Sequence, residues 1–353
     1  MKKLFLLFII LSLSFITLFS GCSKNNQTKD IEIAVFVPGI VSGSPVYEML
    51  VAGIDEAITE YNNSIEEKSS RQKAVLSIME AGTNQSEWSG KMTSLVAQQK
   101  FDVIISSNPS LPDLIAPLTE QFPEQKFIIL DAFLEGNPSI KTVRYNQREQ
   151  AYFSGYIAGL VTKASKEQMK YANSKKKIAL VAAQEYPVMN DILFPGFVEG
   201  ARAVDPEIDV DFTIIGNWYD AAKASEISKA LYNTGVDVIL PICGGAAQGV
   251  IASAKECGFY ITWFDDNGFA KAPGYIISSS VVAQKKSAYE ATTAFLNGNI
   301  EFGKAEILGI KDGYVDFIQD DENYLTSVDE SIRKAVETEF QKVKNGEKEL
   351  PSK

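Results

Sequence analysis

Short apolar segments alternate with longer amphipathic ones through residues 31–265, in two successive runs. The apolar segments are hydrophobic throughout, which is typical of strands in a parallel sheet that is covered on both faces. The amphipathic segments are long enough to form the helices that connect parallel strands. The sequence therefore predicts two doubly wound α/β lobes.

The first run predicts strands at 31–38, 74–80, 101–106, 127–131 and 141–144, with helices at 45–62, 86–99, 112–121 and 149–162. The second run predicts strands at 177–182, 209–216, 236–241 and 260–265, with helices at 193–204, 221–233 and 249–257.

The N-terminus resembles the leader of an exported lipoprotein. Two lysines precede an apolar run at residues 4–19, which is shorter than a membrane-spanning helix and typical of a secretory signal peptide. Phe19-Ser20-Gly21-Cys22 resembles a lipobox, although lipoboxes usually carry Leu or Val at the position of Phe19. We expect residues 1–21 to be removed, Cys22 to carry the lipid, and residues 22–30 to tether the exported protein to a membrane. It would face the periplasm or the outer side of the cytoplasmic membrane.

The size and charge of the chain restrict its partners. About 330 residues remain without the leader, which is more than one core usually covers. Removing the two lysines of the leader leaves 32 basic residues against 45 acidic ones. A surface this acidic repels nucleic acid, so we expect no nucleic-acid partner.

The residue inventory argues against catalysis. The chain contains no histidine, which excludes Ser-His and Cys-His nucleophiles, histidine general bases and histidine-ligated zinc. Asp265 and Asp266 form a poor acid–base pair, because neighbours in an extended segment point to opposite sides. No P-loop or dinucleotide-binding glycine motif follows a predicted strand. We therefore expect a protein that is not an enzyme and has no cofactor or metal.

Two cysteines remain beside Cys22, namely Cys243 and Cys257. Cys243 closes a predicted strand and Cys257 closes the following helix, so roughly 15 Å of helix separates them. A disulfide needs Cα atoms within about 7 Å of each other. We therefore expect two buried free thiols.

Residues that follow the predicted strands are candidates for a ligand site, because ligands of open parallel sheets bind at the carboxyl ends of the strands. Glycine there allows close backbone approach, and Asn and Asp supply hydrogen-bonding groups, although all three are also common in turns. Their recurrence after nearly every strand favours a binding site. The candidates are Asn108, Asp131, Trp218, Gly244, Gly245, Asp265 and Asn267.

Several segments of the chain match motifs of one known family. Residues 122–132 (FPEQKFIILDA) resemble its FPxxKFxxID segment. Residues 197–206 (FVEGARAVDP) and 236–251 (VDVILPICGGAAQGVI) resemble two further segments, and the similarity runs in family order from residue 31 to about residue 313. The family is that of the basic membrane proteins, which are lipid-anchored substrate-binding proteins similar to purine nucleoside receptors.

The resemblance implies a type I periplasmic-binding-protein fold, in which two lobes joined by a three-crossover hinge close on a ligand and deliver it to an ABC permease. Lobe 1 would comprise residues 31–145 and 276–303, and lobe 2 residues 146–275 and 304–353. The strand at 276–282 and the helix after it would thus return to lobe 1. The expected partners are a small-molecule ligand, a permease and a membrane that holds the lipid anchor of a monomer.

Nucleoside receptors of this family stack the base between one aromatic ring from each lobe. The resemblance implies that Trp218 supplies the lobe 2 ring, that Asp265 binds the ribose, and that Asp131 belongs to the site. The lobe 1 ring is replaced by Val46, with Tyr47 next to it. A ribose-binding lysine of the family is also replaced, here by alanine. These departures favour a flat, hydroxylated ligand other than a standard nucleoside.

One branch of the family, the riboflavin-binding lipoproteins of spirochaetes, fits this pattern. The isoalloxazine ring is larger than a purine, and Val46 makes room for it. Uncharged amides suit a neutral, polyhydroxylated molecule. The resemblance thereby adds Ser44, Tyr47, Gln147, Tyr186 and Gln248 to the candidate ligand-binding residues. The leading hypothesis is a riboflavin receptor of an importer, and the alternatives are a purine nucleoside receptor and a non-transport surface lipoprotein or sensor.

Overall fold

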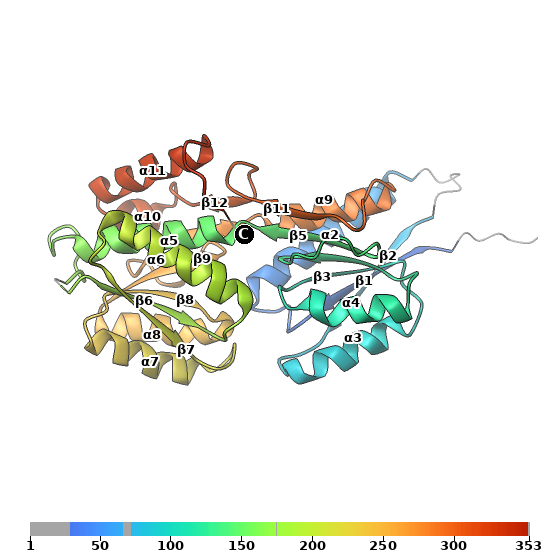
Figure 1. The fold of residues 1–353 in the computed structure, drawn as a ribbon, viewed down its shortest axis with the longest axis horizontal. Helices are drawn as coiled ribbons and strands as arrows, with labels where there is room; N and C mark the ends of the chain where they lie inside the picture. Colours follow the sequence, from blue (N-terminus) through green and yellow to red (C-terminus); the bar gives the residue numbers. More distant parts are fainter. Residues whose placement is uncertain (1–28, 66–71, 174, 352–353) are drawn as a thin grey trace, which may run out of the picture.

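The computed structural model describes residues 29–65, 72–173 and 175–351, and its two lobes lie side by side along the long axis of the molecule (Figure 1). Each lobe contains one six-stranded sheet with helices on both faces. The predicted fold class is therefore confirmed. The predicted leader, Cys22 and most of the predicted tether lie outside the described residues.

The sheet of lobe 1 has the strand order β11-β5-β4-β3-β1-β2, and each neighbouring pair is parallel. Its strands are β1 (Ile31–Val37), β2 (Ala74–Glu80), β3 (Val103–Ser107), β4 (Lys126–Leu130), β5 (Ile140–Tyr145) and β11 (Ala305–Leu308). Its helices are α2 (Pro45–Asn63), the single turn η1 (Gln85–Glu87), α3 (Trp88–Val96), α4 (Leu111–Gln121) and α9 (Gln284–Leu296).

The central strands of lobe 1 are largely apolar because both faces of their sheet are buried. Along β1, Ile33, Val35 and Val37 pack in one core cluster with residues of α2 and α9. Ala34 and Phe36 point to the opposite face and pack with residues of α3 and α4. Successive side chains of a strand alternate between faces, so a strand between two helical layers buries apolar residues on both faces.

The sheet of lobe 2 has the order β12-β10-β9-β8-β6-β7 and is parallel except for β12, which is antiparallel to β10. Its strands are β6 (Lys177–Ala182), β7 (Asp209–Ile214), β8 (Val238–Ile242), β9 (Tyr260–Asp265), β10 (Ile276–Val282) and β12 (Val315–Phe317). Its helices are α5 (Gln147–Lys163), α6 (Phe194–Val204), α7 (Ala221–Asn233), α8 (Ala247–Cys257), α10 (Glu322–Ser327) and α11 (Glu330–Lys344). Short turns of helix are η2 (Met189–Leu193), η3 (Gly244–Ala246) and η4 (Phe269–Lys271).

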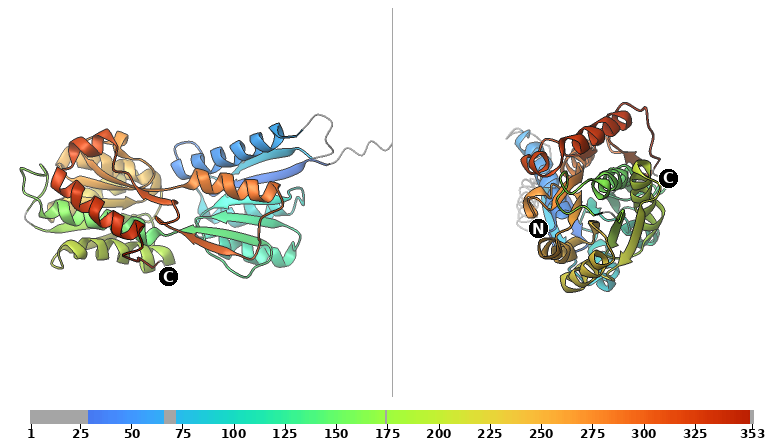
Figure 2. Two further views of the ribbon diagram at one scale, coloured as in Figure 1. Left: turned by 90° about the horizontal axis from the view of Figure 1, so that it is seen from above. Right: turned by 90° about the vertical axis from the view of Figure 1, so that its left-hand side faces the viewer.

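The chain passes between the lobes three times: from β5 to α5, from β10 to α9, and from β11 to β12. Figure 2 shows these connections running between the two lobes. The three crossovers agree with the hinge that the family resemblance implies. They also place the start of α5 beside the end of β5, so that residues of both lobes meet at the hinge.

The predicted lobe boundaries are wrong at the second and third crossovers. The sequence analysis assigns residues 276–282 to lobe 1, but β10 pairs with β9 and β12 in the sheet of lobe 2. Residues 305–308, assigned to lobe 2, form β11 and pair with β5 in lobe 1. The intervening helix α9 does lie in lobe 1, where it packs against α2. A short apolar strand does not encode its sheet, because its partners are distant in the sequence.

Cys243 and Cys257 are free, as predicted. Cys243 is buried, and burial raises the pKa of its thiol to about 12. Cys257, at the end of α8, is half-buried rather than buried. Among the helices of the described part of the chain, none combines the length and the apolar character that a membrane crossing requires.

Helices α5 and α6 pack so closely that glycine is required where they touch. A Cβ atom on Gly200 would lie 1.9 Å from the carbonyl oxygen of Tyr152, and one on Gly155 would lie 2.0 Å from that of Phe197. Both oxygens belong to helix backbone, so they yield only if the helices separate. This packing fixes the position of α5, whose first turn reaches the hinge.

Gly200→Ala is expected to lower the free energy of unfolding by about 1–3 kcal/mol, because the added methyl group forces α5 and α6 apart. Denaturant unfolding followed by circular dichroism measures the change. Gly90→Ala in α3 is the matched control, since no atom lies within 4 Å of the added Cβ. Alanine there is expected to be neutral or to stabilise by up to about 1 kcal/mol. Equal effects of the two substitutions would contradict the prediction.

Candidate functional site

Two aspartates at strand ends of opposite lobes form the centre of the candidate site. Asp131 directly follows β4 of lobe 1, and Asp265 is the last residue of β9 in lobe 2. Their φ angles are 54° and 73°, in the left-handed region that residues other than glycine seldom adopt. Such strained residues cluster at binding and active sites, where the surrounding structure holds them in place.

The two carboxyl groups are electrostatically linked. Burial raises the pKa of Asp131 well above its ordinary value, and the neighbouring Asp265 raises it further, while Arg144 lowers it. Burial also raises the pKa of Asp265 to about 7, and a hydrogen bond from Gln150 acts in the opposite direction. Buried carboxylates of like charge are costly unless hydrogen-bond donors or a cation compensate them. The pair therefore favours a ligand that carries several donors.

Amide side chains at the start of α5 hold both carboxylates. Gln147 Nε2 donates a hydrogen bond to Asp131 Oδ1 at 2.9 Å. Gln150 Nε2 lies 3.5 Å from Asp265 Oδ1 and 3.4 Å from the carbonyl oxygen of Ser280. The Oε1 atoms of Gln147 and Gln150 are buried and have no hydrogen-bond partner among the described residues. Unpaired buried acceptors are costly, so the protein alone leaves this site short of donors.

An aromatic pair from lobe 2 stands beside the carboxylates. The ring centroids of Tyr186 and Trp218 are 6.4 Å apart, and the planes are tilted by 41°. Trp218 Nε1 donates to Gln184 Oε1 at 3.3 Å, which orients the indole. Burial raises the pKa of Tyr186, and the charges of Asp131 and Asp265 raise it further, so the phenol lies near both aspartates. The structure thus brings four predicted site residues together.

Tyr47 and Asn108 contribute from lobe 1. The Tyr47 hydroxyl donates to the carbonyl oxygen of Pro38 at 3.1 Å, so its ring lies against its own lobe. Burial raises the pKa of Tyr47, and Asn108 beside it lowers the pKa through a hydrogen bond. Ser44 precedes α2, but its side chain makes no capping hydrogen bond. We call the set Tyr47, Asn108, Asp131, Gln147, Gln150, Tyr186, Trp218 and Asp265 the interlobe site.

The glycine pair after β8 is exposed and lies against two aromatic side chains of the preceding loop. A Cβ atom on Gly244 would lie 3.4 Å from Cε3 of Trp218, and one on Gly245 would lie 3.5 Å from Cδ1 of Tyr219. The sequence predicts that these glycines allow close approach to the backbone, and in the structure the side chains of Trp218 and Tyr219 make that approach. A ligand contact for Gly244 or Gly245 stays a prediction.

The structure does not join two other predicted residues to the aspartate pair. Asn267 Nδ2 donates to Asp321 Oδ2 at 3.0 Å, and Asn267 Oδ1 accepts from the backbone N–H of Phe269, which ties the side chain into lobe 2 near the start of α10. Gln248 is exposed in the first turn of α8. Their roles in ligand binding stay predictions.

Two residues near the aspartate pair, Arg144 and Gln150, are absent from the sequence-based candidates, as is Tyr219, which lies near Tyr47. Arg144 stands near the end of β5, so the rule that selects strand ends would have found it. Gln150 follows Gln147 by three residues, the spacing that places two side chains on one helix face. Tyr219 carries no signal of its own beyond its position next to Trp218.

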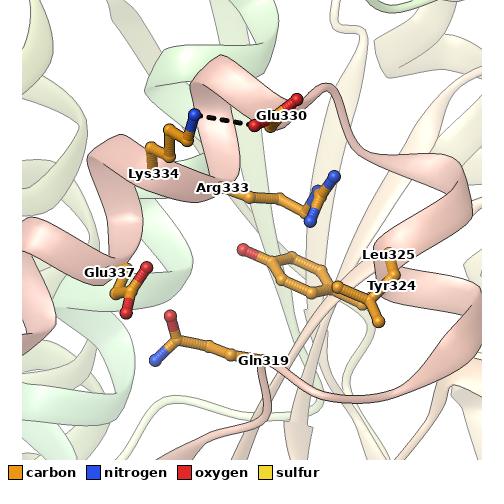
Figure 3. Close-up of a pocket in the computed structure, with 7 residues that line it drawn as sticks. All are labelled: Gln319, Tyr324, Leu325, Glu330, Arg333, Lys334 and Glu337. Atoms are coloured by element: carbon orange, nitrogen blue, oxygen red, sulfur yellow. Dashed lines mark ion pairs between the residues drawn. The ribbon is translucent and has the colours of Figure 1, made fainter.

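Two cavities of about 410 Å³ each lie outside the interlobe site. One lies in lobe 2 between α10 and α11, where Arg333, Lys334 and Glu337 surround Tyr324 (Figure 3). The other lies between α2 and α9, next to the crossover that follows β10. Neither is lined by a residue that the sequence predicts to bind ligand.

Comparison with known proteins identifies the family. The family model described as "ABC transporter substrate-binding protein PnrA-like" matches residues 31–349. The chain belongs to this PnrA-like family. Its members are substrate-binding proteins rather than enzymes, and the predicted family is thereby confirmed.

Relatives of this PnrA-like protein are distant. Basic membrane protein A2 of Borrelia garinii subsp. bavariensis is 25% identical over 331 residues, covering 90% of this chain and 88% of that protein. The nucleoside-binding protein BmpA of an ABC transporter in Lactococcus lactis subsp. cremoris is 28% identical over 158 residues, covering 45% of this chain. That match spans 42% of the length of the Lactococcus protein, and matches to two Listeria antigens span 40% of theirs.

Solved structures support the same fold. An ABC transporter solute-binding protein from Aeropyrum pernix K1 superposes with a TM-score of 0.74 at 17% identity, covering 92% of this chain and 94% of that one. A carbohydrate transporter solute-binding protein from Agrobacterium radiobacter, in complex with D-arabinose, gives a TM-score of 0.60 at 14% identity, covering 86% and 100%. At these low identities, the structural similarity supports the two-lobed fold of the PnrA-like chain and says nothing about its ligand.

Asp265→Asn is expected to change how stability depends on pH. The folded-state pKa of Asp265, about 7, lies above its ordinary value of 3.8. Its contribution to the free energy of unfolding is therefore full below about pH 4 and is lost as the pH rises through about 7. Between these limits wild type should lose about 4 kcal/mol relative to the variant, since each unit of pKa difference corresponds to about 1.4 kcal/mol.

Thermal unfolding across this pH range measures the difference. Asp191→Asn, at an exposed aspartate of the same lobe, controls for the general effect of removing a charge. Parallel pH profiles of wild type and Asp265→Asn would show that the carboxyl group of Asp265 is not held in the proposed environment.

Proposed function

We propose that this chain is the lipid-anchored substrate-binding component of an ABC importer and that it binds riboflavin between its lobes. The observation that carries the proposal is the facing pair Asp131 and Asp265, flanked by amide side chains and by the rings of Tyr186 and Trp218. This combination offers acceptors for hydroxyl groups next to aromatic surface for a flat ring.

Several features favour a large ring. Val46 stands where nucleoside receptors of the family carry a stacking Phe, and the Tyr47 ring is hydrogen-bonded to its own lobe at Pro38. Neither Val46 nor Tyr47 therefore supplies a stacking ring from lobe 1, and the aromatic surface for the ligand comes from Tyr186 and Trp218 of lobe 2. Riboflavin combines a flat isoalloxazine with a chain of hydroxyl groups, which suits this pairing of aromatic surface and carboxylates.

The hydroxyl-bearing chain of riboflavin accounts for the electrostatics. Its hydroxyl groups donate to carboxylates and so offset the cost of two buried acidic groups without adding a charge. The buried amide oxygens of Gln147 and Gln150 are additional acceptors in the same region. A neutral ligand with many donors is therefore the class that we propose.

A purine nucleoside is the second candidate. The Lactococcus relative is named as nucleoside-binding, and a ribose diol also offers donors to the aspartate pair. The two candidates differ in ring size and in the number of hydroxyl groups. Titration of the purified protein with riboflavin, followed by fluorescence quenching, and with inosine, followed by calorimetry, separates them. Mass spectrometry of a small molecule that co-purifies provides an independent identification.

Trp218→Ala is expected to weaken riboflavin binding by about 1–3 kcal/mol, because it removes stacked aromatic area. Fluorescence titration of wild type and variant measures the loss. Tyr232→Ala, which truncates an exposed aromatic residue on α7 of the same lobe, is the control and is expected to leave affinity unchanged. A loss below about 0.3 kcal/mol for Trp218→Ala would remove Trp218 from the site.

The lipid anchor is tested separately through Cys22. In cells expressing the full chain, wild type is expected to incorporate radiolabelled palmitate and to fractionate with membranes. Cys22→Ala removes the thiol that would carry the lipid, so label and membrane retention should both be lost. Unchanged labelling of Cys22→Ala would show that Cys22 is not the lipidated residue.

A further inference from the structure

Tyr219 of lobe 2 extends to lobe 1. It lies in the loop between β7 and α7, and its side chain is 43% exposed. A Cβ atom built on Gly39, in the loop after β1 of lobe 1, would lie 3.5 Å from the Tyr219 hydroxyl oxygen and 3.0 Å from Cε2 of Tyr47. Two tyrosines from opposite lobes therefore meet over Gly39, beside the interlobe site.

The loop that carries Tyr219 is held by hydrogen bonds within lobe 2. Asn217 Oδ1 accepts from the backbone N–H groups of Tyr219 at 2.9 Å and Asp220 at 2.8 Å. The carbonyl oxygen of Trp218 accepts from the backbone N–H of Ala246 at 3.0 Å. A side-chain turn of this kind fixes the backbone locally. The position from which the Tyr219 ring projects is therefore set by its own lobe.

The lobe 1 residues that contact Tyr219 are also held by hydrogen bonds within their own lobe. The backbone N–H of Gly39 donates to the carbonyl oxygen of Val37 at 2.8 Å, and its carbonyl oxygen accepts from Gly82 at 2.9 Å. The Tyr47 hydroxyl donates a hydrogen bond to the carbonyl oxygen of Pro38. Gly39 has a φ of 154°, and a side chain there would meet the Tyr47 ring and the Tyr219 hydroxyl group. Glycine thus leaves the space that the two rings occupy.

Because each partner is fixed in its own lobe, the contact exists only while the lobes are together, and a hinge motion that separates them breaks it. We propose that Tyr219 is a positioning residue that latches the two lobes beside the interlobe site and slows the release of the bound ligand. The identity of the ligand rests on the proposed function, whereas the latch itself does not. Loss of a contact made only in the closed arrangement acts mainly on dissociation.

The test compares wild type with Tyr219→Ala, Tyr219→Phe and the control Tyr232→Ala, which removes an exposed tyrosine of the same lobe away from this contact. Stopped-flow fluorescence measures riboflavin association and dissociation. Tyr219→Ala is expected to dissociate about two- to tenfold faster with unchanged association, because the interlobe contact of Tyr219 with Gly39 is lost. Tyr219→Phe keeps the ring but loses the hydroxyl nearest Gly39, so its rate should fall between the two. The control should match wild type.

Small-angle X-ray scattering without ligand gives a readout that is independent of the proposed function. Tyr219→Ala is expected to have a larger radius of gyration than wild type and than Tyr232→Ala, with the same circular dichroism spectrum. If wild type does not bind riboflavin, the proposed ligand is wrong and the latch is judged by scattering alone. Equal radii of wild type and Tyr219→Ala would then overturn the latch, as would equal dissociation rates if riboflavin binds.

Discussion

Parallel pairing of the strands is the constraint on which the rest of this structure depends. It places the carboxyl ends of all parallel strands at one edge of their sheet, and in each lobe this edge carries a strained aspartate, Asp131 or Asp265. The three crossovers then hold the two lobes so that these aspartates interact. The sheet topology thus places the candidate site between the lobes before any ligand is considered.

The interlobe site combines features that are individually unfavourable. It contains two buried carboxylates, two left-handed backbones and the unpaired buried amide oxygens of Gln147 and Gln150. Each feature costs free energy in the folded protein. The large apolar cores on both faces of each sheet offset that cost. A ligand that supplies hydrogen-bond donors lowers this free-energy cost. Binding of such a ligand would therefore stabilise the arrangement in which the lobes are together.

Family membership and ligand identity rest on different parts of the chain. The family model covers the strands and helices that build both lobes, from residue 31 to residue 349. The proposed ligand contacts instead involve a few residues outside the strands, such as Val46 and Tyr47 at the start of α2 and Trp218 in the loop after β7. Relatives and structural neighbours of this chain include a protein named as nucleoside-binding and one in complex with D-arabinose, so binding measurements on this chain decide its ligand.

The sequence by itself determined the two lobes, because continuous apolar runs between amphipathic helices have no other stable arrangement than sheets covered on both faces. It also selected Asp131, Asp265 and Trp218 as candidates, since residues at and just after strand ends can be identified locally. Only the tertiary structure decided the sheet to which β10 and β11 belong, because strand pairing joins segments far apart in the chain. For the same reason it alone assigned Asn267 to a contact with Asp321 and revealed that Tyr219 reaches the opposite lobe.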